Sequence, residues 1–331
     1  MMSEEKIVQA EDLQEEKKSK RIVFDRNTIL TVVPILTLVI IALILGLFTK
    51  NFLTVRNFIN VLEQASVLAL LAMGITAVLV SGGIDLSLPA NLSLGAVVGA
   101  IYMRSGGNLV VSALIMVGVC VLVGAVNGFA VSYLNMIPLV VTLAMQFVAV
   151  GAATALTGSI SISDLPMAYI DAVQFRLFGV PIYSIIVIIL TVVFFLVMTR
   201  SYFGRWLYAV GTNPKAARVS GIPSKSVIFG AYVFAGLTAG LAAVISVGRL
   251  MSASALMAGD NLVLDVIASA VVGGVSIFGG IGNPLGAALG ALLITLISNS
   301  MNMMRVSYYL TLVIKGLVII IFVYLNSLRR K

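Results

Sequence analysis

Residues 65–103 read ASVLALLAMGITAVLVSGGIDLSLPANLSLGAVVGAIYM, two apolar runs with a polar joint between them. The runs cover 65–81 and 87–103, and each is slightly shorter than the roughly 20 helical residues that cross a hydrocarbon core. The joint SGGIDLSLP at 81–89 holds two glycines and a proline, which weaken regular helix. The stretch therefore predicts two membrane-spanning helices with a break between them.

The joint contains one acid, Asp85. A carboxylate is costly in hydrocarbon unless it faces water, protein or a helix N-terminus. In one interpretation the broken helix lines an aqueous path, as broken helices of transporters do. In the other, the joint is a tight turn at the cytoplasmic surface and Asp85 caps the following helix. The sequence leaves both open.

Composition places the chain in a membrane. Of its 331 residues, 60% are hydrophobic and 10% are charged, whereas soluble chains are about half apolar and about a quarter charged. The chain has no His and a single Cys, Cys120. Imidazole chemistry, an intrachain disulfide and a cysteine zinc site are thereby excluded. We expect a protein that is not an enzyme and that holds no cofactor or metal of its own.

The apolar runs predict an all-α, polytopic bundle of about ten spans within residues 29–325. Polar tails are expected at 1–28 and 326–331, and broken helices near 81–89 and 273–284. The expected spans are 29–49, 65–81, 87–103, 109–132, 137–157, 180–199, 227–247, 262–278, 284–304 and 307–325.

The cations indicate an orientation. Of the 21 Lys and Arg residues, 14 lie in the two tails and in the loop 200–226. Cytoplasmic segments carry such an excess, so we expect both termini and this loop in the cytoplasm. The formal charge of +8 then reflects contact with membrane lipid and needs no nucleic-acid partner. The connection 158–179 would lie outside, where it has the length for a short amphipathic segment.

The loop 200–226 reads RSYFGRWLYAVGTNPKAARVSGIPSKS, with five cations and no acid. Asn213 and Pro214 are typical of a helix N-cap and first residue, and Gly221 of a helix end. A short capped helix between two spans suits docking into a groove of another protein. Alternatively, the loop contacts only lipid headgroups. The segment's residues are Gly211, Asn213, Pro214, Lys215, Ala216, Ala217, Arg218, Ser220 and Gly221.

Three stretches carry a family resemblance: SGGIDLSLPANLSLGA at 81–96, YAVGTNPKAARVSGI at 208–222 and VVGGVSIFGGIGNPLGAALGALLI at 271–294. In this order they resemble the membrane permease subunits of bacterial ABC importers for ribose-type monosaccharides. These permeases are related to the branched-chain amino acid permeases. The resemblance covers nearly everything after the N-terminal tail.

The resemblance implies an importer in the bacterial inner membrane. Two permease subunits, a second copy or a paralogue, would enclose the path, ABC ATPase subunits would drive it, and an extracytoplasmic solute-binding protein would deliver the solute. The chain has no G-x-x-x-x-G-K-[ST] loop, so ATP and Mg would belong to the ATPase. Residues 208–222 would form the coupling helix. The expected solute is a monosaccharide; the alternatives are nucleosides or branched-chain amino acids in the same architecture, or an ion-coupled secondary transporter.

A sugar is recognised by amides and carboxylates that bond its hydroxyl groups, with apolar surface against its ring. An intramembrane amide can equally bond a neighbouring helix. The expected path residues are Asp85, Asn91, Asn127, Gln146, Phe147, Asn299 and Asn302. The glycines expected at the breaks are Gly82, Gly83, Gly273, Gly274, Gly279 and Gly280. Asp85, Asp265 and Lys315 are the charges deepest in apolar sequence, and they keep the ion-coupled alternative open.

Overall fold

The structure is a computed structural model that describes residues 46, 52–257, 259 and 261–328. This part of the chain forms twelve helices and one two-stranded antiparallel hairpin. The helices are α3 (Val55–Val80), α4 (Leu88–Arg104), α5 (Leu109–Ser132), α6 (Pro138–Thr157), α7 (Met167–Gln174), α8 (Ile182–Arg200), α9 (Tyr202–Thr212), α10 (Pro214–Val219), α11 (Ser224–Leu250), α12 (Leu262–Val272), α13 (Pro284–Met303) and α14 (Tyr308–Leu328). The hairpin strands are β1 (Arg176–Leu177) and β2 (Val180–Pro181).

Six of the described helices are long and apolar enough to cross a membrane: α3, α5, α6, α8, α11 and α13. The prediction of a polytopic helical membrane protein is therefore confirmed, but the number ten is not. The expected span 29–49 lies outside the described residues. The expected span 262–278 was too long, because α12 ends at Val272 and the chain then leaves the helix.

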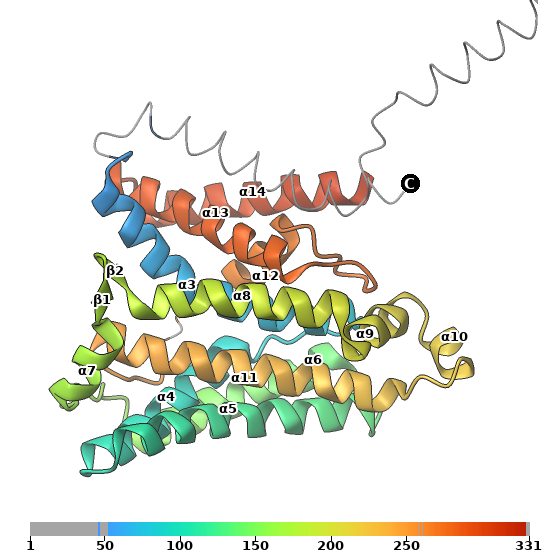
Figure 1. Cartoon of the computed structure of the whole chain (residues 1–331), viewed down its shortest axis with the longest axis horizontal. Helices are drawn as coiled ribbons and strands as arrows, with labels where there is room; N and C mark the ends of the chain where they lie inside the picture. Colours follow the sequence, from blue (N-terminus) through green and yellow to red (C-terminus); the bar gives the residue numbers. More distant parts are fainter. Residues whose placement is uncertain (1–45, 47–51, 258, 260, 329–331) are drawn as a thin grey trace, which may run out of the picture.

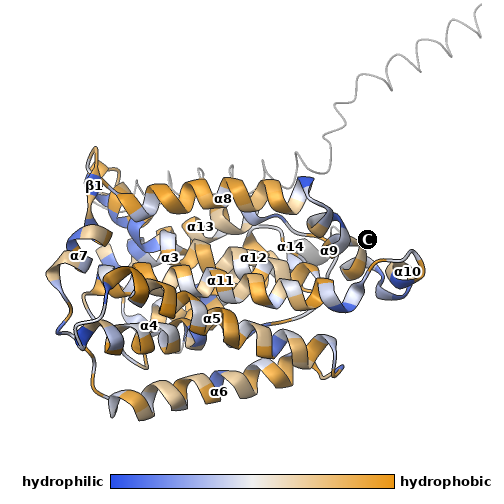
Figure 2. Cartoon of the chain, turned by 60° about the horizontal axis from the view of Figure 1, so that its bottom comes forward, coloured by the Kyte–Doolittle hydropathy of each residue, from blue (hydrophilic) through white to orange (hydrophobic). Residues whose placement is uncertain are grey.

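The long helices lie side by side in an elongated bundle (Figure 1). Figure 2 shows that α5, α6 and α8 are hydrophobic along most of their length, as helices that face lipid are. By contrast, α3 is buried without interruption from Ala65 to Val80. The core of the bundle is therefore a helix that the others surround.

Small residues let the central helices approach closely. On α11, Ala235, Ala239 and Ala243 are fully buried. A Cβ added at Gly236 would lie 3.1 Å from the Cα of Val121 on α5 and closer still to a backbone oxygen. In lipid, helices associate through such packing, because water exclusion offers no driving force there.

The bundle has two distinct ends (Figure 1). The hairpin end carries α7, β1 and β2, and the α10 end carries α9 and α10. The expected amphipathic segment at 158–179 is confirmed as α7, whose Tyr169 and Ile170 are buried. The Tyr169 hydroxyl donates to the backbone oxygen of Val244, which anchors α7 to α11.

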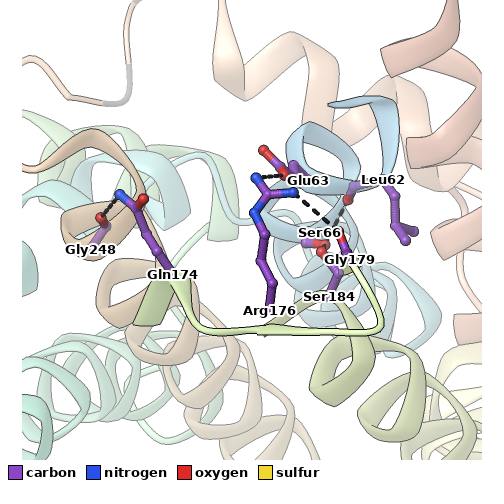
Figure 3. A network of polar contacts seen from close by, with 8 residues as sticks. All are labelled: Leu62, Glu63, Ser66, Gln174, Arg176, Gly179, Ser184 and Gly248. Carbon is purple, nitrogen blue, oxygen red and sulfur yellow. Dashed lines mark hydrogen bonds and ion pairs between the residues drawn. The ribbon is translucent and has the colours of Figure 1, made fainter. Parts of the chain in front are cut away.

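Polar contacts fasten the hairpin end (Figure 3). Arg176 of β1 donates to the Glu63 carboxylate of α3 at 2.8 Å and to the Gly179 carbonyl at 3.1 Å. The Gln174 amide donates to the Gly248 carbonyl of α11 at 3.0 Å. Helices α3 and α8 are joined by a hydrogen bond of 3.0 Å between the hydroxyls of Ser66 and Ser184. Together these contacts hold α3, α7, α8 and α11 to one another.

Candidate functional site

The break between α3 and α4 covers residues 81–87; Ser81, Gly83, Asp85 and Ser87 are buried, whereas Gly82 is exposed. Asp85 is only 2% exposed. Its carboxylate accepts hydrogen bonds from the Ser87 backbone N–H at 2.9 Å and from the Ser87 hydroxyl at 2.6 Å. The Asn127 amide of α5 in turn donates to the Ser87 hydroxyl at 2.8 Å. Ser87, and not Asp85, is the N-cap of α4, so the interpretation of Asp85 as the cap of this helix was wrong.

Neighbouring helices also satisfy the backbone of this break. The Ile84 carbonyl accepts hydrogen bonds from the hydroxyls of Tyr232 on α11 and Thr142 on α6, both at 3.3 Å. A backbone carbonyl that leaves a helix needs other hydrogen-bond partners where water is excluded. The Ile84 carbonyl finds two such partners on neighbouring helices.

The second break, residues 273–283, contacts the first. The Gly280 N–H donates to the Val80 carbonyl at the end of α3, at 2.9 Å. Gly279 and Gly280 have φ of +88° and +72°, a conformation that glycine adopts readily. The two predicted breaks are thus confirmed as non-helical segments, and they lie against each other.

Helix α9 is fitted against both breaks. The Tyr208 hydroxyl donates to the Gly282 carbonyl at 2.6 Å. A Cβ added at Gly211 would lie 2.7 Å from the Gly280 nitrogen and closer still to the Val80 carbonyl oxygen. Real Cβ atoms essentially never approach within 3.0 Å. The ends of α3 and α9 and the second break therefore form one close backbone junction, which we call the coupling junction (Val80–Ser87, Tyr208–Thr212 and Gly273–Asn283).

The predicted short helix in the loop 200–226 is confirmed as α10. The Asn213 side chain accepts from the backbone N–H groups of Lys215 and Ala216 at 3.1 and 3.0 Å, and Pro214 is the first helical residue. Gly221 follows with φ of +78°. The structure places α10 beyond the ends of the long helices (Figure 1).

Sequence reasoning missed α9, which precedes α10. Its buried residues Leu207 and Val210 lie on one side of the helix, with Gly204 one turn earlier. This spacing of i, i+3 and i+6 is compatible with one helical face. The cations of the loop pointed to a solvent-exposed segment, so the apolar face of α9 was not recognised.

The expected path residues are divided among different places. Asn91 and Asn127 are buried near Asp85, and Asn299 is buried on α13. In the part of the chain that the structure describes, the side-chain oxygens of these three amides have no hydrogen-bond partner. Gln146 is half-buried and Phe147 is 70% exposed on α6. Asn302 is exposed near the end of α13.

A cavity of about 300 Å³ lies toward the hairpin end, between α3, α4, α11, α12, α13 and α14. Polar side chains on its wall include Gln64, Arg249, Asp265, Thr295, Ser298 and Lys315. Lys315 donates to both oxygens of the Asp265 carboxylate, at 3.0 and 2.8 Å. Among the described residues, none of the seven expected path residues lines this cavity.

The sequence singled out Asp265 and Lys315 but did not pair them. Charged residues within spans usually pair with one another, so their opposite signs were the available signal. Gln64, Arg249, Thr295 and Ser298 were missed, because nothing in the sequence shows which helix faces meet around a cavity.

Comparison with known proteins decides the family. Residues 57–323 match the family described as branched-chain amino acid transport system / permease component. The chain belongs to this permease family. The ribose import permease protein RbsC of Bacillus subtilis (strain 168) is 35% identical, covering 96% of this chain and 98% of its own. No solved structure matches.

Two further relatives agree with this assignment. The D-allose transport system permease protein AlsC of Escherichia coli (strain K12) is 34% identical over 88% of this chain and 90% of its own. A probable ABC transporter permease protein of Sinorhizobium fredii is 35% identical over 87% of this chain and 86% of its own. The permease is accordingly a membrane component of an ABC transporter and not an enzyme, and the family resemblance seen in the three motifs is confirmed.

Proposed function

We propose that this permease imports a monosaccharide across the bacterial cytoplasmic membrane, using an ATPase that docks on α10. The observation that carries the proposal is the full-length similarity to permeases named for ribose and D-allose. The cavity adds support, because its polar wall and its volume of about 300 Å³ suit a small hydroxylated solute. Nucleosides and branched-chain amino acids remain the alternatives within this architecture.

In this proposal the hairpin end faces the outside and the α10 end faces the cytoplasm. The α10 end carries Arg205, Lys215, Arg218 and Lys225 within one loop that has no acid. From the positive-inside rule we expect this loop, and both chain termini, in the cytoplasm. The hairpin end would receive the extracytoplasmic binding protein.

The coupling junction supplies the physical link to ATP hydrolysis. The ATPase, which carries ATP and Mg, would bind α10, and α10 follows directly on α9. Because α9 contacts Val80 and Gly282, a displacement of α10 acts on both breaks at once. A second permease subunit, a copy or a paralogue, would complete the path.

Family membership favours ATP-driven import over ion coupling. An ion-coupled carrier uses an intramembrane acid that is free to bind and release its ion. Asp265 instead has both carboxylate oxygens bonded to Lys315. Asp85 likewise accepts two hydrogen bonds from Ser87.

Reconstitution tests the proposal. The permease is placed in liposomes with its ATPase and binding protein, and uptake of D-ribose, D-allose, D-galactose, uridine and L-leucine is compared. We expect uptake of one of the sugars that requires ATP. Uptake without the ATPase, or uptake of L-leucine or uridine alone, would contradict the proposal.

Two variants test whether the ATPase docks on α10. Val219 on α10 is 89% exposed and Phe178 on the hairpin is 97% exposed. We expect Val219→Glu to abolish co-purification of the ATPase and Phe178→Ser to leave it unchanged. Equal co-purification by both variants would argue against docking at α10.

A further inference from the structure

The cavity at the hairpin end contains a charged pair that lies outside the coupling junction. Asp265 on α12 and Lys315 on α14 bond each other at 2.8 Å, and their side chains are 19% and 13% exposed. Both line the cavity. The pair therefore lies at an internal surface that a small solute can reach.

The other polar groups of the wall come from different helices. Gln64 belongs to α3, Arg249 to α11, and Thr295 and Ser298 to α13. A gap between membrane helices that binds no solute would be lined by apolar side chains. Polar side chains in such a place are costly and tend to mark solute pathways. Convergence of donors and acceptors from five helices, α12 and α14 included, indicates a binding site.

We propose that this cavity is a saccharide-binding chamber, in which the Asp265 carboxylate accepts and the Lys315 ammonium donates hydrogen bonds to hydroxyl groups of the transported sugar. The inference rests on the proposed function, because it takes the solute to be a monosaccharide. Neighbouring hydroxyls of a sugar offer donors and acceptors together, which matches an acceptor-only carboxylate beside a donor-only ammonium. Leu68, Leu92 and Ile294 supply apolar surface for the ring.

The two walls of the chamber are held differently. On one side, Gln64 and Arg249 directly follow Glu63 and Gly248, which the network of Figure 3 fastens to the hairpin and to α7. On the other side, the Asp265–Lys315 pair joins α12 to α14. A sugar that bonds this pair therefore acts directly on the contact between α12 and α14.

The first test uses charge variants in the reconstituted transporter with D-ribose, D-allose and D-galactose as probes. We expect Asp265→Asn to lower sugar uptake by about tenfold or more, the size expected for losing a hydrogen bond to a charged group. Gly118→Ala on α5, where nothing lies within 4 Å of an added Cβ and which does not line the cavity, should leave uptake unchanged. Unchanged uptake by the Asp265 variant would overturn the proposal, whereas absence of uptake by the unaltered permease would instead overturn the proposed function.

A swapped pair separates binding from stability. Asp265→Lys combined with Lys315→Asp restores an ion pair but exchanges the positions of donor and acceptor. We expect this variant to regain the thermal stability of the unaltered permease and to remain deficient in sugar uptake. Full recovery of uptake would show that the pair has only a structural role.

A labelling experiment keeps the proposal testable if the swapped variant does not fold. The natural thiol, Cys120, is fully buried, so S298C introduces a thiol in the chamber and S163C an exposed one on the loop before α7. We expect the transported sugar to slow methanethiosulfonate labelling of S298C and not of S163C. Labelling of S298C that no sugar slows, or that L-leucine alone slows, would overturn the saccharide chamber.

Discussion

Replacing Gly211 by Ala is the sharpest test of the coupling junction. The added methyl group would lie 2.7 Å from the Gly280 nitrogen, and ordinary contact begins at 3.4 Å. The difference is 0.7 Å, and the Val80 carbonyl oxygen lies closer still. All the atoms in the way are backbone, so α9 has to move away from α3 and from the second break.

The cost follows from two terms. Overpacking a well-packed site costs about 1–3 kcal/mol, and loss of the Gly280–Val80 hydrogen bond adds about 0.5–1.5 kcal/mol. At about 2 °C per kcal/mol for a chain of this size, the thermal midpoint should fall by about 3 °C or more. Sugar uptake should fall further than stability, because the displaced helix is the one that links α10 to both breaks.

The assay compares thermal unfolding of the purified permease with ATP-dependent uptake in liposomes. Gly118→Ala on α5 is a matched control, since nothing lies within 4 Å of a Cβ at that position. Alanine also favours helix over glycine by about 1 kcal/mol, so this control should be as stable as the unaltered permease or more so. A Gly211→Ala variant with unchanged midpoint and unchanged uptake would refute the close junction.

Three smaller changes probe separate contacts. Asn213→Ala removes the N-cap of α10 and should cost about 1 kcal/mol of local helix stability, seen as faster hydrogen exchange in residues 214–219. Tyr208→Phe removes the hydroxyl that bonds Gly282 and should lower stability by about 0.5–1.5 kcal/mol in thermal unfolding, with an unchanged midpoint counting against the bond. Arg176→Ala removes an ion pair whose arginine is half exposed; it should change stability by no more than about 1 kcal/mol, while hydrogen exchange in residues 176–181 rises.

What the sequence predicted correctly depends on local chemistry. The start of α10 follows from Asn213 and Pro214, whose side chains act on backbone within three residues. The two breaks follow from glycines and prolines that disfavour helix where they stand. Such features need no knowledge of the rest of the fold, which explains why they could be placed to within a few residues.

The chamber and the coupling junction could not be predicted in the same way. Asp265 and Lys315 are 50 residues apart, and their pairing requires that α12 and α14 present particular faces to each other. Gly211 is identifiable as a glycine in a loop, but its neighbours Val80 and Gly280 lie far from it in the sequence. The exposure of Phe147 likewise depends on how α6 is rotated about its axis, and its side chain lies on the exposed face of that helix. In each case the deciding contact is between helices and not within one.

The chamber and the coupling junction share two helices. Val80 ends α3 in the junction, and Gln64 on the same helix lines the chamber; at 1.5 Å per residue they are about 24 Å apart. Pro284 begins α13 directly after the second break, and Ser298 lies about 21 Å further along. Because α3 is buried without interruption from Ala65 to Val80, it can move only together with its neighbours. A displacement imposed at Gly211 and Gly280 is therefore expected to reach the lining of the chamber through α3 and α13, two helices that pack against each other, and this connects α10 to the cavity.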